Sequence, residues 1–349
     1  MMTKVVVALS GGVDSSVAAA MLKQQGWEVV GLTLRLGSDP ALAPASDSES
    51  AACQCAQMLD IPLHVLDIAG TFHREIVQFF LDGYANGITP NPCVRCNRLV
   101  KWGVLLDQAL ALGAEYLATG HYARKRTINT GRLELLRAVD HAKDQSYVLH
   151  VLTQEQLKRA LFPVGENTKS EIRALAWNFG LPAAARNESQ DLCFLAGEDY
   201  RDFIRRNAPE MARSGPILTR AGRSLGEHQG LAYYTIGQRK GLGISSPVPL
   251  YVLAKDAAAN TLVVGVEAEL GESELLAEEV NWIAGEAPGG PFRAQVKTRY
   301  TAKEAWAEVT PLGADRAAVH FEAPQRDITP GQAAVFYAGE VVLGGGLIR

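Results

Sequence analysis

The sequence predicts an α/β fold in which a parallel sheet carries helices on both faces, followed by a small β-rich middle domain and a C-terminal β-barrel. Two patterns predict this arrangement. Short apolar runs alternate with helical stretches up to about residue 205, which is typical of strands joined by helices in a parallel sheet. Beyond Pro209, glycines are frequent and short alternating runs are separated by turn signals. We therefore expect domains over residues 1–205, 206–275 and 276–349.

The first domain contains four apolar runs with the length and composition of buried strands. Residues 5–9 include three adjacent valines, as a strand buried on both faces demands. The expected strands cover residues 5–9, 29–34, 63–68 and 116–119, and the expected helices include residues 74–84, 99–112, 153–162 and 168–179. Residues 38–50 are rich in small residues, proline, aspartate and serine, so we expect a mobile surface loop there.

The second half of the chain has the pattern of short strands and turns. The expected strands lie at residues 251–253, 262–264, 294–297 and 333–337. Asp256 to Asn260 lies between two apolar runs and predicts a hairpin loop. Residues 271–279 are expected to link the middle domain to the last β-barrel.

Length, charge and cysteine content limit the function classes. The chain has 349 residues, of which 47% are hydrophobic, so it can bury ordinary cores. It shows no secretory leader pattern and no apolar run near the roughly 20 residues that cross a bilayer, so we expect a cytoplasmic protein without membrane contact. Its five cysteines are then not expected to form a structural disulfide framework.

The formal net charge of −4 argues against a protein that coats nucleic acid by bulk electrostatics. Short basic runs nevertheless occur in each expected domain. They include residues 95–101, 124–126, 239–240 and 297–300. A charge run is commonly a solvated face, but four of them in three domains favour a shared surface for nucleic acid.

A glycine-rich loop, SGGVDSS at residues 10–16, follows the first expected strand and leads into a helix. Free backbone N–H groups at the start of such a helix, with glycines that allow close approach, form a cradle for phosphate. A Walker loop is excluded, because no lysine lies between Lys4 and Lys23. A carboxylate beside phosphate needs a divalent cation between them, so we expect Asp14 to bind Mg²⁺ directly or through water. A tight turn with a serine cap is the alternative.

A second group of chemically active residues lies at residues 88–102, ITPNPCVRCNRLVKW. Prolines flank Asn91, so we expect Cys93 and Cys96 on an extended loop that leads into a helix from about Asn97. A single C-x-x-C motif fits half of a zinc site, a redox pair, two cluster ligands or a nucleophile with a helper. Zinc is disfavoured, because the chain has no second C-x-x-C motif to complete the site.

The cysteines differ in the roles that their surroundings favour. The helix start and the neighbouring Arg95 and Arg98 are expected to push the C-x-x-C thiols toward thiolate, from an ordinary pKa of about 8.5. Cys193 lies in a polar stretch and is either a buried structural cysteine or a third reactive thiol. Cys53 and Cys55 are expected on a helix, as packing or surface residues.

An adenylating loop, a reactive C-x-x-C motif and a distant cysteine are the parts needed to place sulfur on an activated carbonyl. With these parts the chain resembles the bacterial tRNA-specific 2-thiouridylases, which belong to the PP-loop ATPase superfamily. The resemblance covers nearly the whole chain, and several of its motifs are individually rare. Besides residues 10–16, the matching motifs lie at residues 89–92, 96–97, 118–122, 143–147, 162–165, 193–194, 226–230, 235–243, 296–300 and 329–332.

The resemblance implies a PP-loop domain that uses ATP to adenylate the carbonyl oxygen on carbon 2 of the wobble uridine of tRNA, which makes AMP the leaving group. It implies an ATP site formed by Ala8, Leu9, Ser10, Gly11, Gly12, Val13, Asp14, Ser15, Leu34 and Gly120. It implies contacts to tRNA, some of them in the C-terminal barrel, from Asn91, Pro92, Cys93, His121, Lys143, Asp144, Gln145, Arg299, Tyr300 and Gln332. Without the resemblance, His121 would be interpreted as a packed core histidine.

The resemblance also implies that Cys96 and Cys193 are the catalytic pair. Cys193 would carry a persulfide delivered by a sulfur donor, such as a cysteine desulfurase or a sulfur-relay protein. The terminal sulfur would attack the activated carbon directly, or would leave as hydrosulfide when Cys96 attacks Cys193 to form a disulfide. We expect the free protein to be a monomer.

The sequence departs from the family pattern at two places. Cys93 stands where many members carry aspartate, and residues 189–193 are SQDLC where STGIC is expected. The first change removes a carboxylate, which leaves any acid-base role of that group unfilled. It also gives three thiols, Cys93, Cys96 and Cys193, that could hold a 4Fe–4S cluster with one iron free for sulfide. We expect the persulfide route and keep the cluster as the alternative.

Two other classes of protein share some of these features. A PP-loop synthetase that adenylates a small molecule for attack by ammonia would explain residues 10–16, but not the C-x-x-C motif or a barrel with residues 297–300. A noncatalytic RNA-binding module that keeps ATP as a structural ligand would leave the cysteines unexplained.

Overall fold

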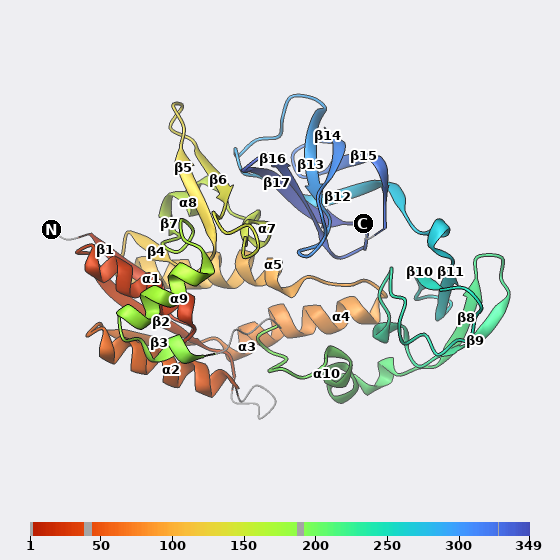
Figure 1. The fold of residues 1–349 in the computed structure, drawn as a ribbon, viewed down its shortest axis with the longest axis horizontal. Coiled ribbons are helices and arrows are strands. Elements are labelled where there is room, and N and C mark those ends of the chain that lie inside the picture. The colour runs from red at the N-terminus through yellow and green to blue at the C-terminus, as the bar shows by residue number, and fades with distance from the viewer. Residues whose placement is uncertain (1–2, 38–43, 187–191, 327) are drawn as a thin grey trace.

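The computed structural model describes residues 3–37, 44–186, 192–326 and 328–349. These residues form three sheets joined by helices (Figure 1). The parallel sheet lies at the N-terminal end of the molecule, and helices extend from it toward the middle sheet, with the C-terminal barrel beside them (Figure 1). The fold class expected from the sequence is confirmed. Among the described residues, no helix is both long and apolar enough to cross a membrane.

The N-terminal sheet is parallel throughout, and its strand order is β3-β2-β1-β4-β7. Its strands are β1 (Lys4–Ala8), β2 (Glu28–Arg35), β3 (Leu63–Asp67), β4 (Tyr116–Ala118) and β7 (Ala160–Leu161). The chain runs from β1 to β2 and β3 on one side, and then to β4 and β7 on the other. The strand order therefore reverses between β1 and β4, which is where sheets of this kind leave a crevice at the carboxyl ends of their strands.

Helices flank this sheet, and further helical segments lie along the rest of the described chain. They are α1 (Val13–Gln24), α2 (Pro44–Met58), α3 (Ala69–Phe72), η2 (His73–Gln78), α4 (Phe79–Ala85), α5 (Pro92–Cys96), η3 (Asn97–Leu105), α6 (Leu106–Ala111), α7 (Ser146–Leu149), α8 (Gln154–Arg159), α9 (Lys169–Asn178), η4 (Pro182–Ala185), α10 (Tyr200–Asn207), η5 (Pro209–Met211), η6 (Leu231–Tyr233) and η7 (Glu267–Glu269). The segments η2 and η3 are π-helical, and η4 to η7 are 3₁₀ turns.

One helix prediction and one loop prediction need correction. The helix expected over residues 153–162 ends at Arg159, because the chain there joins the sheet as β7. The loop expected over residues 38–50 is helical from Pro44, and residues 38–43 lie outside the described part of the chain. The helix expected over residues 168–179 is confirmed, with Thr168 and Glu171 forming a capping box at its start.

The middle sheet has the strand order β10-β11-β8-β9. Its strands are β8 (Gly215–Thr219), β9 (Ser224–His228), β10 (Tyr251–Asp256) and β11 (Thr261–Gly265). The hairpin predicted around residues 256–260 is confirmed, since β10 and β11 pair in antiparallel fashion across it.

The C-terminal strands form a closed barrel, because β12 pairs with β15 on one edge and with β17 on the other. Its strands are β12 (Glu272–Trp282), β13 (Phe292–Lys297), β14 (Ala305–Pro311), β15 (Ala317–Gln325), β16 (Ala333–Ala338) and β17 (Val341–Ile348). The linker expected over residues 271–279 is wrong. Residues 272–279 belong to β12, where Leu275 and Ala277 point into the barrel core between more exposed acidic neighbours.

A hairpin from the N-terminal domain is docked onto the barrel. It consists of β5 (Ala123–Thr127) and β6 (Leu133–Arg137), and β6 pairs with β17 through Leu136 and Val341. The barrel also contacts the N-terminal domain at Gln332, whose Nε2 donates to the Thr89 carbonyl at 2.9 Å. The hairpin and this hydrogen bond therefore hold two domains that are distant in sequence against each other.

Gly165 allows the hairpin to lie against the parallel-sheet domain. A Cβ at this position would lie 1.8 Å from the carbonyl oxygen of Ala123 on β5, so the two backbones must separate when any side chain is added. We predict that Gly165→Ala lowers the free energy of unfolding by about 2–4 kcal/mol. Gly289→Ala is the matched control, since a Cβ there would have open space within 4 Å, and it should change stability by less than about 0.5 kcal/mol. Urea titrations of both variants that coincide would contradict this explanation.

Candidate active site

The predicted phosphate loop joins β1 to α1 at the switch point of the parallel sheet. Gly12 is the N-cap of α1 in an extended conformation, and no side chain caps the helix start. Gly11 has φ of +73°, and a Cβ there would lie 2.6 Å from the Ser48 carbonyl oxygen of α2. The Ser15 hydroxyl lies 3.1 Å from the Ser10 hydroxyl, and this hydrogen bond joins the two ends of the loop. This arrangement leaves the first-turn N–H groups of α1 available to an anion.

The end of β4 completes the loop's surroundings. A Cβ on Gly120 would lie 2.6 Å from the Ser15 backbone nitrogen, so this position needs glycine for the two segments to touch. Ala8 and Leu34 lie at the carboxyl ends of β1 and β2, on the same edge of the sheet as Gly120. The residues expected to hold ATP are therefore neighbours in space. Their geometry suits a nucleotide whose phosphates lie on the start of α1.

Asp14 is the charged residue of this loop, and it is already paired. The Lys169 ammonium lies 2.6 Å from Asp14 Oδ1, and the Tyr122 hydroxyl donates to the same oxygen at 2.8 Å. An ammonium is suited to contact phosphate directly, whereas a carboxylate would reach it through Mg²⁺. Lys169 and Tyr122 were missed from the sequence. The available signal was the capping box that places Lys169 at the first position of α9.

The C-x-x-C motif lies on a helix, not on the extended loop that the prolines predicted. Helix α5 starts at Pro92, and Asn91 is its N-cap, accepting a hydrogen bond from the Val94 N–H at 3.2 Å. Proline is tolerated at the first position of a helix, because the N–H group that it lacks has no intrahelical partner there. Cys93 is therefore in the first turn, and Cys96 just beyond it, of a continuous helical segment that runs on through η3.

Cys193 is positioned by the packing of the next residue, Phe194. Phe194 is buried in an aromatic cluster, with ring centroids 5.2 Å from Phe80, 5.3 Å from Phe203 and 6.4 Å from Phe72. The Cys193 side chain is exposed, and its thiol interacts electrostatically with those of Cys96 and Cys93. The fold therefore brings together three cysteines that the sequence separates. Residues 187–191, where the SQDLC departure begins, lie outside the described part of the chain.

The expectation that the C-x-x-C thiols are pushed toward thiolate is wrong. Desolvation by the surrounding protein raises the pKa of Cys93 to about 11 and that of Cys193 to about 12, and it raises the pKa of Cys96 as well. Arg95 and Arg98 do not offset this, because Arg95 pairs with Glu75 at 2.9 Å and Arg98 with Glu279 at 2.6 Å. Another cation is therefore needed to lower the pKa values of these thiols.

All five cysteines are free thiols in this structure. Within residues 3–37, 44–186, 192–326 and 328–349, no group of three histidine, cysteine, aspartate or glutamate side chains is placed to hold a metal ion. The 4Fe–4S alternative therefore gains no support from the arrangement of Cys93, Cys96 and Cys193. As expected, Cys55 is buried in α2, and Cys53 lies nearer the surface of that helix.

The residues expected to contact tRNA fall into two groups. Tyr300 is exposed over 41% of its surface, and its phenol interacts electrostatically with Cys93, so it lies beside the cysteines. Cys93 itself is exposed, and Asn91, Lys143, Gln145, Arg299 and Gln332 are partly exposed.

The second group is buried. His121 and Asp144 are 6% and 5% exposed, and Pro92 is also buried. Asp144 accepts hydrogen bonds from the Ala138 N–H and the Ser146 hydroxyl, and lies 3.8 Å from the Arg137 guanidinium.

Most basic side chains in the runs expected to bind nucleic acid in the N-terminal domain pair with other groups of the protein. Arg124 pairs with Glu340 at 2.8 Å, and Arg126 pairs with Glu134 at 2.6 Å. The Lys125 ammonium donates to the Leu157 carbonyl at 2.8 Å, near the end of α8. These residues stabilise the docked hairpin, which reduces the charge that residues 124–126 can offer to phosphates.

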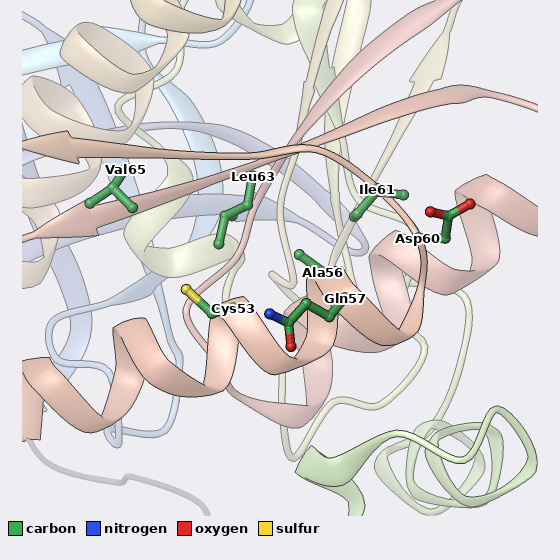
Figure 2. Close-up of a pocket in the computed structure, with 7 residues that line it drawn as sticks. All are labelled: Cys53, Ala56, Gln57, Asp60, Ile61, Leu63 and Val65. Atoms are coloured by element: carbon green, nitrogen blue, oxygen red, sulfur yellow. The ribbon is translucent and has the colours of Figure 1, made fainter.

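A surface pocket lies away from this site, between α2 and β3 (Figure 2). It has a volume of about 480 Å³ and is lined by Cys53, Ala56, Gln57, Asp60, Ile61, Leu63 and Val65. None of these residues belongs to the phosphate loop or to the cysteine group. The pocket is at the outer edge of the parallel sheet, because β3 is the edge strand.

Comparison with known proteins gives full-length matches. Residues 3–197, 201–266 and 272–348 match families described as the tRNA methyl transferase HUP domain, the tRNA methyl transferase PRC-barrel domain and the aminomethyltransferase beta-barrel domain. The tRNA-specific 2-thiouridylase MnmA of Roseiflexus castenholzii is 49% identical over 99% of both chains, and that of Moorella thermoacetica is 48% identical over 98% of both. A solved structure of a 4-thiouridine synthetase in complex with RNA and ATP is 16% identical, and the match covers 60% of this chain and 51% of the synthetase chain. Its TM-score of 0.39 is too low for the likeness to support an argument.

Proposed function

The chain belongs to the family of tRNA-specific 2-thiouridylases, which makes it a tRNA sulfurtransferase, and we propose that it replaces the oxygen on carbon 2 of the wobble uridine by sulfur at the expense of ATP. One observation supports this most strongly. Gly120 touches the phosphate loop, and its neighbour His121 hydrogen-bonds Lys101, which interacts with the cysteines. Because Gly120 and His121 are adjacent in the chain, a nucleotide bound at the loop would lie near a sulfur atom carried by the cysteines.

In the first step that we propose, the uridine oxygen on carbon 2 attacks the α phosphate of ATP. A bond forms between this oxygen and phosphorus, the bond to the β phosphate breaks, and pyrophosphate leaves. The first-turn N–H groups of α1 and the Lys169 ammonium suit the negative charge of the phosphates, and Asp14 would hold Mg²⁺ beside them. The uridine then carries AMP, a much better leaving group than the original carbonyl oxygen.

In the second step, sulfur comes from a persulfide on Cys193. Its terminal sulfur bonds to carbon 2 directly, or is first released as hydrosulfide and then bonds to carbon 2. On either route the bond between carbon 2 and the adenylated oxygen breaks, and AMP leaves with that oxygen. In both cases the Cys96 thiolate attacks Cys193 Sγ, the sulfur–sulfur bond of the persulfide breaks, and its electron pair stays on the departing sulfur. The products are AMP, thiolated tRNA and a disulfide between Cys96 and Cys193, which an external dithiol would reduce. The electrostatic contact between these two thiols supports this pairing.

The remaining assignments complete the proposal. Residues 1–205 would form the catalytic domain, residues 206–275 the middle domain, and residues 276–349 a tRNA-binding barrel. The sulfur donor would be a cysteine desulfurase or a sulfur-relay protein in the cytoplasm, and the free enzyme would be a monomer. The direct test is to incubate the purified protein with unmodified tRNA, ATP, Mg²⁺ and a persulfide donor, and to digest the tRNA for mass spectrometry. Absence of 2-thiouridine would overturn the proposal.

We propose that Tyr300 stacks on a base that has left the anticodon loop. It is exposed, its ring centroid lies 6.0 Å from that of Tyr147, and the Lys297 ammonium lies 5.7 Å from it. We predict that Tyr300→Ala weakens tRNA binding by about 5- to 150-fold, since stacking contributes about 1–3 kcal/mol per base, whereas Tyr300→Phe retains binding. Trp306→Ala, at a barrel tryptophan that is 42% exposed, is the control. Filter binding in which Tyr300→Ala matches wild type would exclude stacking on this ring.

A further inference from the structure

We propose that Lys101 is a catalytic residue of the sulfur-transfer step, where its ammonium stabilises the negative charge on the sulfur atoms of Cys96 and Cys193. This inference rests on the proposed function, in which Cys96 attacks Cys193 as a thiolate. Lys101 lies five residues after Cys96, its ammonium contacts the buried His121, and it interacts electrostatically with the cysteines. Its position, its partners and its charge each support this role.

Lys101 is held in place by a hydrogen-bonded chain that ends in the protein interior. Its Nζ lies 3.0 Å from His121 Nε2, and His121 Nδ1 lies 2.8 Å from Thr119 Oγ1. Burial and the nearby ammonium hold the pKa of His121 well below its ordinary value, so the ring is neutral. Lysine has only N–H groups to donate, so Nε2 accepts and Nδ1–H donates to Thr119. The ring thus orients the ammonium without neutralising it.

The π-helical segment η3 explains why Lys101 reaches the cysteines. In an α-helix, a residue five positions after Cys96 would lie about 140° round the axis from it, on a different face. In a π-helix the hydrogen bonds run from residue i to i+5, so residues five apart lie close to one turn apart and on nearly the same face. Because η3 starts directly after Cys96, Lys101 comes to the side of the helix that carries the C-x-x-C thiols.

Lys101 is the cation near the motif that remains available to sulfur. Arg95 and Arg98 are paired with Glu75 and Glu279, whereas no carboxylate in the described part of the chain lies within 4.0 Å of the Lys101 ammonium. Lys101 acts on each of Cys93, Cys96 and Cys193 to lower the pKa of its thiol, against the larger effect of desolvation. The other ionisable groups facing these thiols are one another and Tyr300.

The chemistry of the step needs a cation at this place. Cys96 must lose its proton to solvent before it can attack Cys193 Sγ. As the persulfide bond breaks, the electron pair moves onto the terminal sulfur. Both the attacking and the departing sulfur therefore carry negative charge, which a fixed ammonium nearby stabilises. Lys101 would favour both of these anionic states without taking part in the adenylation step.

The test compares Lys101→Gln, which can still donate to His121 but has no charge, with Lys101→Arg and with the surface control Lys158→Gln. Cys96 and Cys193 are alkylated with iodoacetamide from pH 7 to pH 10 in protein without tRNA or ATP, and each site is followed by peptide mass spectrometry. Because loss of the cation raises the thiol pKa, we expect about three- to tenfold slower alkylation in Lys101→Gln at pH 8 and a midpoint shifted to higher pH. Lys101→Arg and Lys158→Gln should match wild type.

Single-turnover assays give the catalytic readout. Lys101→Gln is expected to thiolate tRNA at least tenfold more slowly than wild type, while pyrophosphate release in the presence of tRNA changes by less than twofold. Unchanged alkylation and unchanged thiolation in Lys101→Gln would overturn the role of Lys101. If this variant does not fold, Lys101→Met replaces it in both assays under the same criteria. A wild-type protein that does not thiolate tRNA would instead overturn the proposed function, and the alkylation comparison would still decide whether Lys101 activates the thiols.

Discussion

Cys193→Ser is expected to abolish 2-thiouridine formation, with a loss of at least about a thousandfold in the single-turnover rate. A serine hydroxyl has nearly the shape of the thiol but cannot carry a second sulfur, so the variant has nothing to transfer. Cys96→Ser should show a comparable loss, because it removes the attacking thiolate that breaks the persulfide bond. Since neither residue belongs to the phosphate loop, pyrophosphate release in the presence of tRNA should persist in both variants.

The matched control for this pair is Cys53→Ser. Cys53 lines the surface pocket between α2 and β3, whose lining includes none of Cys93, Cys96 and Cys193, so its loss should leave thiolation within twofold of wild type (Figure 2). The readout is 2-thiouridine by mass spectrometry, with pyrophosphate measured in the same samples. Thiolation at the wild-type rate by Cys193→Ser would remove the persulfide from the mechanism. Loss of pyrophosphate release together with thiolation would mean that the cysteines act before adenylation.

Asp14→Asn is expected to reduce tRNA-dependent pyrophosphate release by about 10²- to 10³-fold. Asparagine keeps the shape of the side chain and can still accept from the Tyr122 hydroxyl, but it loses the charge that pairs with Lys169 at 2.6 Å and would hold Mg²⁺. If Asp14 binds the cation, the Mg²⁺ concentration that gives half-maximal activity should rise at least tenfold in the variant.

Asp60→Asn is the control for this prediction, because Asp60 is a fully exposed aspartate outside the loop. Both proteins are compared with wild type by pyrophosphate release across a Mg²⁺ titration, and by thermal unfolding to confirm an intact fold. An Asp14→Asn variant with the wild-type rate and the wild-type Mg²⁺ dependence would exclude Asp14 from the nucleotide site.

The phosphate loop could be predicted from sequence because its determinants are local. Three adjacent valines, two glycines and the apolar spacing after Ser15 indicate a buried strand, a loop and a helix, and the structure has β1 and α1 at these places. The partners of Asp14 could not be predicted in the same way. Lys169 lies 155 residues away, and only the packing of α9 against α1 brings it to the loop.

The C-x-x-C motif shows how a correct local rule can be applied at the wrong position. Proline breaks helices in their interior, and this rule placed the helix start near Asn97. Pro92 instead occupies the first helical position, where proline is favoured, so the helix starts before both cysteines. Asn91 was the available signal, since asparagine before proline is a common helix cap.

The state of the thiols depended on contacts that the sequence does not reveal. Arg95 and Arg98 lie beside the cysteines in sequence, but Glu75 and Glu279 pair with them, from 20 and 181 residues away. Lys101 is positioned by the π-helical segment η3 and oriented by His121, and neither feature can be predicted from the local sequence pattern. Likewise, residues 271–279 are expected to be a linker from sequence, whereas residues 272–279 belong to β12 through pairing with β15 and β17.

The most direct test of the proposed mechanism is to follow one sulfur atom through one turnover. Cys193 is loaded with a ³⁴S-labelled persulfide, excess donor is removed, and unmodified tRNA is added with ATP and Mg²⁺. The mechanism predicts one AMP, one pyrophosphate and one ³⁴S-labelled 2-thiouridine for each loaded enzyme, with a new disulfide between Cys96 and Cys193. Release of ADP and phosphate, or 2-thiouridine without the label, would contradict it.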